Sequence, residues 1–155
     1  MLLARLLQND YRVVLLESNP DRVAQIRSID PPLECRRTTD ETFAAVFETG
    51  GTAGSADLAV NLLAPGGTAV FVGLSQSPLK LTPFQIARRA LTIRGSIIYD
   101  HEIDFPASLT WLSRHGTSSL MPTRSFAFEN VPEAFESLAQ GDTVKAIITM
   151  EGTVE

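Results

Sequence analysis

The stretch LLAPGGTAVFVGL, residues 62–74, decides the fold. Its pattern predicts the end of a helix, a tight turn at Pro65-Gly66-Gly67 and then a strand over residues 68–72. Pro65 cannot continue a helix, and the two glycines after it can take a positive φ without steric cost. The strand residues are apolar without polar alternation, which is typical of a strand covered on both faces. Gly73 then allows another group to approach the backbone closely.

Helical and strand patterns alternate along the rest of the chain, which predicts an α/β fold with a parallel sheet and crossover helices. The predicted helices cover residues 1–8, 21–29, 55–63, 83–90, 102–115 and 130–139. The predicted strands cover residues 11–17, 33–37, 42–48, 68–72, 91–98 and 145–150. Ligands bind at the carboxyl ends of strands in such sheets, so we expect a site above Gly73.

Two helix starts carry capping signals. Asn19 is expected to cap a helix that has Pro20 at its first position. Asn130, with Glu133 three residues later, resembles a capping box. The helix over residues 1–8 has no cap and is apolar on almost every side, as a buried helix is. We therefore expect that the chain begins inside an element whose first part is absent.

The composition indicates one globular domain: 155 residues, of which 44% are hydrophobic and 20% charged. The net charge of −5 argues against nucleic-acid and membrane-surface partners, because both need a basic face. No apolar run approaches the roughly 20 residues of a membrane helix. A single cysteine, Cys35, excludes an internal disulfide and a Cys-rich zinc site. Together with the lack of a signal-peptide pattern, this predicts a reducing cytoplasm.

The remaining chemistry-bearing residues give few site candidates. His101 and His115 are separated by the length of a helix, so no metal-ligand set and no catalytic set is predicted. Trp111 and Phe105 are expected in the core face of an amphipathic helix. Glu17, at the end of a buried strand, is either a solvated charge or a carboxylate that binds ribose hydroxyls of a dinucleotide.

The chain resembles the carboxy-terminal, cofactor-binding half of medium-chain zinc-type alcohol dehydrogenases, the group of sorbitol and threonine dehydrogenases. The matching segments are VVLLESNPDR (13–22), AAVFETGG (44–51), LLAPGGTAVFVGL (62–74), LTIRGSI (91–97) and FENVPEAFESLAQGDTVKAIITM (128–150). The resemblance implies one dinucleotide-binding domain over residues 1–155. Its fold would be a Rossmann-like, doubly wound parallel sheet.

The resemblance also implies a cofactor and the residues that bind it. NAD is expected rather than NADP, because a ribose-binding carboxylate at Glu17 repels a 2′-phosphate. Asn19 and Arg22 would lie near the adenine, and Lys145 would reach the pyrophosphate. The segments that would flank the central region and the nicotinamide carboxamide comprise Thr49, Gly50, Gly51, Val72, Gly73, Leu74, Ser96, Ile97 and Ile98.

Several parts of the family's enzyme are not found in this sequence. They are the first strand, its glycine-rich turn and the catalytic domain with its zinc ligands. We therefore expect that the chain alone does not transfer hydride between an alcohol or carbonyl substrate and nicotinamide, as the intact enzyme would. In the strand order 3-2-1-4-5-6 the first strand is central, so its loss predicts a gap between the second and fourth strands. A shifted element, intermolecular strand pairing or direct closure would compensate for this gap.

The resemblance further implies a homodimer through an edge strand from Leu91 to Ile98, because an apolar exposed edge is a liability unless it is paired. Two alternative functions remain open. One is an S-adenosylmethionine-dependent methyltransferase, which shares an acid after the second strand and a Pro-Gly-Gly turn. The other is a non-catalytic nucleotide-sensing domain.

Overall fold

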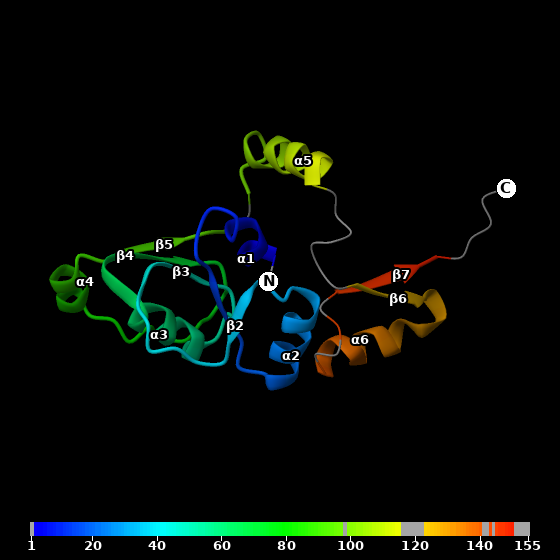
Figure 1. Cartoon of the computed structure of the whole chain (residues 1–155), viewed down its shortest axis with the longest axis horizontal. Helices are drawn as coiled ribbons and strands as arrows, with labels where there is room; N and C mark the ends of the chain where they lie inside the picture. Colours follow the sequence, from blue (N-terminus) through cyan, green and yellow to red (C-terminus); the bar gives the residue numbers. More distant parts are fainter. Residues whose placement is uncertain (1, 98, 116–122, 141–142, 144, 151–155) are drawn as a thin grey trace. The chain divides into compact units, whose positions relative to one another are not determined.

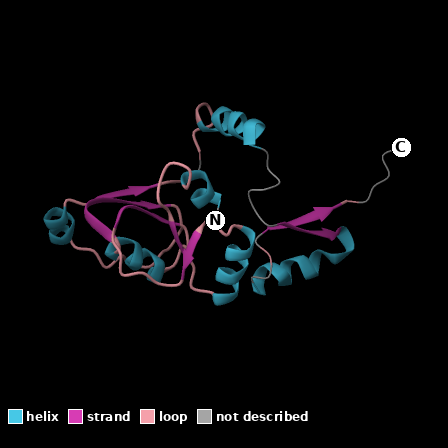
Figure 2. Ribbon diagram, in the orientation of Figure 1, coloured by secondary structure: helices cyan, strands magenta, loops and turns pink. Residues whose placement is uncertain are grey.

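The computed structural model describes residues 2–97, 99–115, 123–140, 143 and 145–150. It has an α/β fold whose strands form three parallel sheets (Figures 1 and 2). Contacts divide the chain into two compact units, residues 40–105 and residues 1–39 with 106–155. We describe each unit by itself.

The unit of residues 40–105 contains a three-stranded sheet in the order β3-β4-β5. Its strands are β3 (Phe43–Glu48), β4 (Leu63–Phe71) and β5 (Thr92–Gly95), and its helices are α3 (Ala53–Asn61) and α4 (Pro83–Arg89). Each helix connects two neighbouring parallel strands, as the alternating pattern predicts. The core of this unit is built around Val60, Leu63, Ala69 and Leu91.

The predicted Pro-Gly-Gly turn between a helix and a strand is wrong in one respect. Helix α3 ends at Asn61, and β4 already begins at Leu63 and includes the Pro-Gly-Gly segment. The pairing of β4 with β3 shifts register there, from Leu63 to Thr68. The segment is therefore an irregularity inside a strand, where a proline that cannot donate to the ladder is tolerated.

The two glycines of this irregularity serve different purposes. Gly66 has a φ of +78°, as its predicted conformational freedom allows. Gly67 is needed for space instead, because a Cβ atom there would lie 2.8 Å from the carbonyl oxygen of Ala64.

The other unit begins with α1 (Leu2–Leu7), β1 (Val14–Leu16), α2 (Pro20–Ile29) and β2 (Glu34–Arg36). Strands β1 and β2 are parallel. Their core is built around Ala4, Val23, Ile26, Leu33 and Cys35. Helix α1 thus packs through Ala4, and Arg5 Nε donates to Asp30 Oδ2 at 2.6 Å.

Asn19 caps α2 as predicted. Its Oδ1 accepts hydrogen bonds from the backbone nitrogens of Asp21 and Arg22, and Pro20 is the first helical residue. The cap fixes the path of the chain between β1 and α2, where Glu17, which is predicted to bind ribose, lies.

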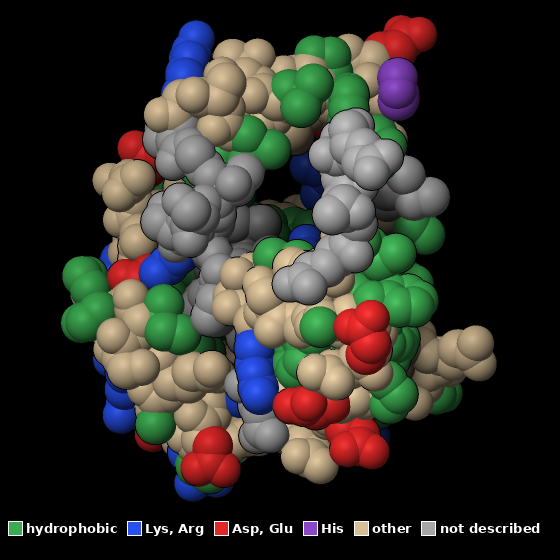
Figure 3. Space-filling view, turned by 90° about the vertical axis from the view of Figure 1, so that its right-hand side faces the viewer, with side chains coloured by type: hydrophobic (Ala, Val, Ile, Leu, Met, Phe, Trp, Pro, Cys, Tyr) green, Lys and Arg blue, Asp and Glu red, His purple; other side chains and the backbone are tan. Residues whose placement is uncertain are grey.

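The same unit contains most of α5 (Asp104–His115), and β6 (Thr123–Ala127), the 3-10 helix η1 (Phe128–Asn130), α6 (Val131–Gln140) and β7 (Lys145–Thr149). Strands β6 and β7 pair in parallel over all five residues. β6 was not predicted from the sequence. Asn130 ends η1, which leads directly into α6, instead of forming the predicted capping box. Figure 3 views the chain from the side of α6 and β7, where hydrophobic side chains lie at the surface beside acidic ones.

Phe105 does not belong to the core, contrary to the prediction. Its side chain is 45% exposed and its ring stacks on His101, with ring centroids 5.5 Å apart. Trp111 is half-buried.

Strands β1 and β3 each have a single strand partner in the structure. In the described part of the chain, β1 pairs only with β2, and β3 pairs only with β4. The gap expected between the second and fourth strands of a doubly wound sheet stays a prediction.

Over the described residues, no helix combines the length and the apolar character needed to cross a lipid bilayer.

Candidate functional site

Three loops meet the carboxyl edge of the β3-β4-β5 sheet. They are residues 49–51 after β3, 72–74 after β4 and 96–97 after β5. Because the strands are parallel, their carboxyl ends lie at the same edge. The structure thus brings together eight of the residues that the sequence analysis selected, and Ile98 lies outside the described residues.

Backbone hydrogen bonds fix these loops. The nitrogens of Val72 and Gly73 both donate to the carbonyl oxygen of Glu48, at 2.8 and 2.9 Å. The nitrogen of Ser96 donates to the carbonyl oxygen of Phe71 at 2.9 Å. The strand ladder therefore continues beyond the ends of β4 and β5 into the loops.

Gly73 permits a close approach, as predicted, but the neighbour belongs to the chain itself. A Cβ atom at Gly73 would lie 2.3 Å from the backbone nitrogen of Gly51 and 2.5 Å from Oε2 of Glu48. Gly51 has a φ of +66°, and a Cβ there would lie 3.2 Å from the nitrogen and the oxygen of Leu74. The turn after β3 and the loop after β4 therefore pack backbone against backbone.

Gly95 is the last residue of β5 and pairs in register with Phe71. Nothing lies within 4 Å of a Cβ atom placed on it.

The edge presents apolar side chains to its surroundings. Val72 is 42% exposed, Leu74 80% and Ile97 73%. Exposed apolar groups beside backbone donors and acceptors suit a flat ligand that has an apolar face and a polar edge.

Glu48, which was not selected from the sequence, connects two of these segments. Its side chain is buried, and Oε1 accepts hydrogen bonds from the nitrogens of Gly50 and Gly51 and from Oγ of Ser55. The signal was available: an acid ends an apolar strand and two glycines follow shortly after, as an acid ends the strand at Glu17.

Glu17 lies directly after β1 in the other unit, where the sequence places it. Its nitrogen donates to the carbonyl oxygen of Arg36, and its Oε1 accepts from the nitrogen of Asn19 at 2.9 Å. Arg22 Nη1 lies 3.8 Å from Glu17 Oε2. The three residues predicted for the adenosine end are therefore neighbours, and the carboxylate already has a guanidinium partner.

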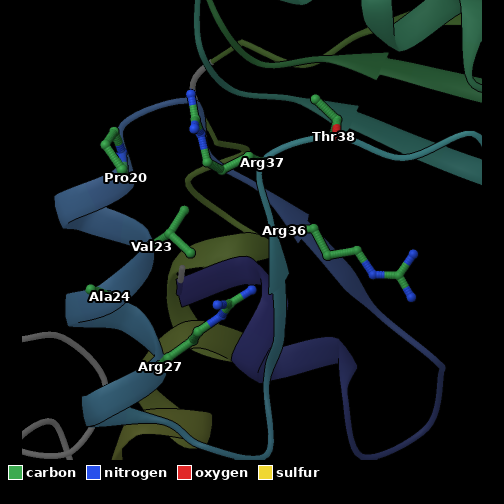
Figure 4. A pocket seen from close by; sticks show the side chains of 7 residues that line it. All are labelled: Pro20, Val23, Ala24, Arg27, Arg36, Arg37 and Thr38. Atoms are coloured by element: carbon green, nitrogen blue, oxygen red, sulfur yellow. The ribbon is translucent and has the colours of Figure 1, made fainter.

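A surface pocket of about 380 Å³ lies beside these residues, between α2 and the segment after β2 (Figure 4). Its arginines do not converge. Arg27 donates to the carbonyl oxygen of Cys35, Arg37 donates to that of Ser18, and Arg36 extends away from α2 and pairs with Glu34. The remaining lining residues are Pro20, Val23, Ala24 and Thr38.

Lys145 is the first residue of β7, opposite Thr123 of β6, and its side chain is exposed. It belongs to a different sheet from the other predicted residues.

The surroundings of Cys35 and Asp57 shift the pKa values of their side chains. Burial raises the pKa of the Cys35 thiol, although nearby Arg27 opposes this shift. The hydrogen bond from the backbone nitrogen of Lys80 lowers the pKa of the Asp57 carboxyl, to which the Lys80 ammonium also pairs at 3.4 Å. In the part of the chain that the structure describes, no three His, Cys, Asp or Glu side chains gather as metal ligands would.

Comparisons with known proteins agree with this geometry. The sequence profile of the zinc-binding dehydrogenase family matches residues 3–114. No curated protein sequence matches the chain.

Solved structures are similar in fold at low identity. A Clostridium scindens protein (gutB), described as a zinc-binding dehydrogenase, has a TM-score of 0.78 at 19% identity, over 97% of this chain and 46% of its own. A protein described as a short chain alcohol dehydrogenase (rspB) from Escherichia coli, complexed with cofactor NADH, has a TM-score of 0.77 at 17% identity, over 96% and 48%. The 2R,3R-butanediol dehydrogenase from Bacillus subtilis has a TM-score of 0.70 at 20% identity, over 89% and 43%. The chain spans less than half the length of these proteins.

Proposed function

The chain belongs to the zinc-binding dehydrogenase family, and from this premise we propose that it is the cofactor-binding portion of an alcohol or polyol dehydrogenase-type oxidoreductase. The observation that carries the proposal is the set of loops at the carboxyl edge of β3, β4 and β5. Dinucleotides bind at this edge of doubly wound sheets.

The loop residues fit the nicotinamide end of NAD. Backbone groups of residues 72–74 and 96–98 would bind the carboxamide, and the apolar side chains of Val72 and Leu74 would contact the ring. Residues 49–51 would pack beside the central part of the cofactor. When bound, nicotinamide supplies the carbon that accepts or donates a hydride.

Glu17 supports a preference for NAD over NADP. Its carboxylate would accept hydrogen bonds from the adenosine ribose hydroxyls and would repel a 2′-phosphate. Asn19 keeps this carboxylate oriented through its backbone nitrogen, and Arg22 would lie near the adenine. Lys145 would contribute a positive charge to the pyrophosphate, without the bidentate geometry of an arginine.

The activity of the whole enzyme is part of the proposal, because the chain spans under half of its structural relatives. Its substrate would be a small alcohol or carbonyl compound. The catalytic zinc, where the intact protein uses one, would be held by residues of the catalytic domain and not by this chain. Residues 1–155 alone would bind cofactor without turning over substrate, in a reducing cytoplasm.

A homodimer through β5 is also part of the proposal. β5 pairs with β4 on one side, all four of its residues are exposed, and Ile93 presents an apolar side chain. A second copy of β5 across a two-fold axis would pair the open edge.

Thermal-shift measurements with NADH, NADPH and S-adenosylmethionine test the proposed function. We expect NADH to raise the melting temperature more than NADPH does, and S-adenosylmethionine to leave it unchanged. Stabilisation by S-adenosylmethionine alone would favour the methyltransferase alternative, which the family match disfavours.

A further inference from the structure

Glu48 ends β3, and its carboxyl-bearing side chain is only 4% exposed. A buried carboxylate is retained only when hydrogen bonds replace its water. Three donors do so at one oxygen: the nitrogens of Gly50 and Gly51 at 2.7 and 2.8 Å, and Oγ of Ser55 at 2.7 Å from Oε1. The side chain thereby folds the turn after β3 around itself and connects it to the first turn of α3.

The backbone of the same residue holds the loop after β4. Its carbonyl oxygen accepts from the nitrogens of both Val72 and Gly73. Its other side-chain oxygen, Oε2, faces Gly73 so closely that only a glycine fits there, because a Cβ atom would lie 2.5 Å from it. One residue therefore fixes the turn at residues 49–51 relative to the loop at residues 72–74.

We propose that Glu48 is a positioning residue that sets the spacing of these two segments for the nicotinamide end of the dinucleotide. The inference rests on the proposed function, which places the nicotinamide at the same edge. Glu48 does not contact the cofactor in this account. It acts through Gly51 and Gly73, whose backbones meet directly.

A carboxylate is suited to this task because it is an acceptor only. A glutamine at position 48 keeps one oxygen for the three donors, but its amide presents hydrogens toward Gly73. An alanine leaves the Gly50 and Gly51 nitrogens and the Ser55 hydroxyl without their acceptor. Glu48→Gln should therefore weaken NADH binding less than Glu48→Ala does.

The test compares two ligands in the 155-residue chain, NADH and ADP-ribose, which lacks the nicotinamide. Binding is measured by calorimetry in the wild type, Glu48→Ala, Glu48→Gln and the control Glu136→Ala, whose exposed carboxylate lies on α6. We expect Glu48→Ala to weaken NADH binding by about tenfold or more, because donors that position the loops lose a charged acceptor. ADP-ribose binding should stay within about twofold of wild type, as the loss is confined to the nicotinamide end.

Ser55→Ala and Thr52→Ala keep the inference testable if Glu48→Ala does not fold. Both substitutions remove the capping box of α3, but only Ser55 donates to Glu48. Ser55→Ala should weaken NADH binding more than Thr52→Ala does. If Ser55→Ala and Thr52→Ala weaken NADH binding equally, the inference is overturned.

The outcomes separate the inference from the proposed function. Equal weakening of NADH and ADP-ribose by Glu48→Ala, or no weakening of either, overturns the positioning role while the proposed function stands. A wild-type chain that binds neither ligand overturns the proposed function, and the inference with it.

Discussion

At the scale of single residues, two carboxylates organise the ends of strands in this chain. Glu17 turns its oxygens toward Asn19 and Arg22, whereas Glu48 is buried and saturates one oxygen with three donors. Glu17 is therefore suited to bind a ligand in place of its present partners, and Glu48 is suited to hold a loop.

Glu17→Gln should weaken NADH binding by about tenfold, because a charge-assisted hydrogen bond to ribose is replaced by a neutral one. The same change should reduce the preference for NADH over NADPH, since the repulsion of a 2′-phosphate is removed. Fluorescence titration with both cofactors measures this, with Glu133→Gln on α6 as an exposed control. An unchanged NADH to NADPH ratio would contradict a ribose role for Glu17.

Cys35 should react slowly with a thiol reagent in the folded chain. Its side chain is 3% exposed, and burial raises its pKa, so little of the reactive thiolate is present at pH 8. Unfolding in guanidinium should restore the rate of an ordinary cysteine. A native rate equal to the unfolded rate would show that the core around β2 is open in solution.

At the scale of elements, Gly73 and Gly54 make a matched pair, because the first is crowded by backbone and the second has open space around it. Gly73→Ala should lower the free energy of unfolding by about 1–3 kcal/mol, because its Cβ would collide with the backbone of Gly51. Gly54→Ala, in α3 with open space around it, should raise stability by roughly 0.5–1 kcal/mol. Urea denaturation measures both, and a tolerated Gly73→Ala would disprove the close packing of the two loops.

The contact between α1 and α2 gives another prediction. Arg5 and Asp30 form an ion pair whose side chains are 13% and 9% exposed. Arg5→Ala should lower the free energy of unfolding by about 1–3 kcal/mol, because the buried Asp30 carboxylate loses the guanidinium that donates to it. Glu133→Ala breaks the exposed ion pair with Arg124 and should lower the free energy of unfolding by less than about 1 kcal/mol. Equal costs in denaturation experiments would show that α1 is not held by this pair.

The sequence predicted most elements, because their signals are local. Asn19 with Pro20 marked the start of α2, and the apolar run at residues 13–16 marked β1. The errors occurred where tertiary contacts decide. β6 has the sequence TRSFA, whose polar residues carry no strand pattern until β7 pairs with it. The Pro-Gly-Gly segment joins β4 because β3 can shift register beside it.

The sequence predicted that these loops follow the strand ends, but not the contacts between them. Gly73 stood out as a glycine after a strand, but its neighbour is Gly51, a contact between loops that no local pattern encodes. Glu48 was missed because its burial depends on three donors from a turn and a helix. The roles of Asn19, Arg22 and Lys145 toward a cofactor came from family resemblance, and they stay predictions.

At the scale of the whole molecule, the sheets leave strand edges that other segments must cover. β1 and β3 each have one strand partner in the described residues, and so does β5. Open edges of parallel sheets are rare in stable monomers, because the edge offers its hydrogen-bonding groups to other chains.

Light scattering tests the dimer that we propose through β5. The chain should have twice its monomer mass of 16.9 kDa at high concentration, and Ile93→Lys should shift it to the monomer by placing a charge on the edge strand. Leu138→Lys on α6 should leave the mass unchanged. A wild-type monomer at high concentration would contradict the β5 interface.

The most direct test of the central claim is an NMR titration of the ¹⁵N-labelled chain with NADH. We predict that NADH shifts the amide signals of Gly73 and Leu74 together with those near Glu17 and Asn19. ADP-ribose, which lacks the nicotinamide, should shift the signals near Glu17 and Asn19 but not those of Gly73 and Leu74. Saturating NADH that moves neither set would contradict the proposal that this chain is the cofactor-binding portion of a dehydrogenase.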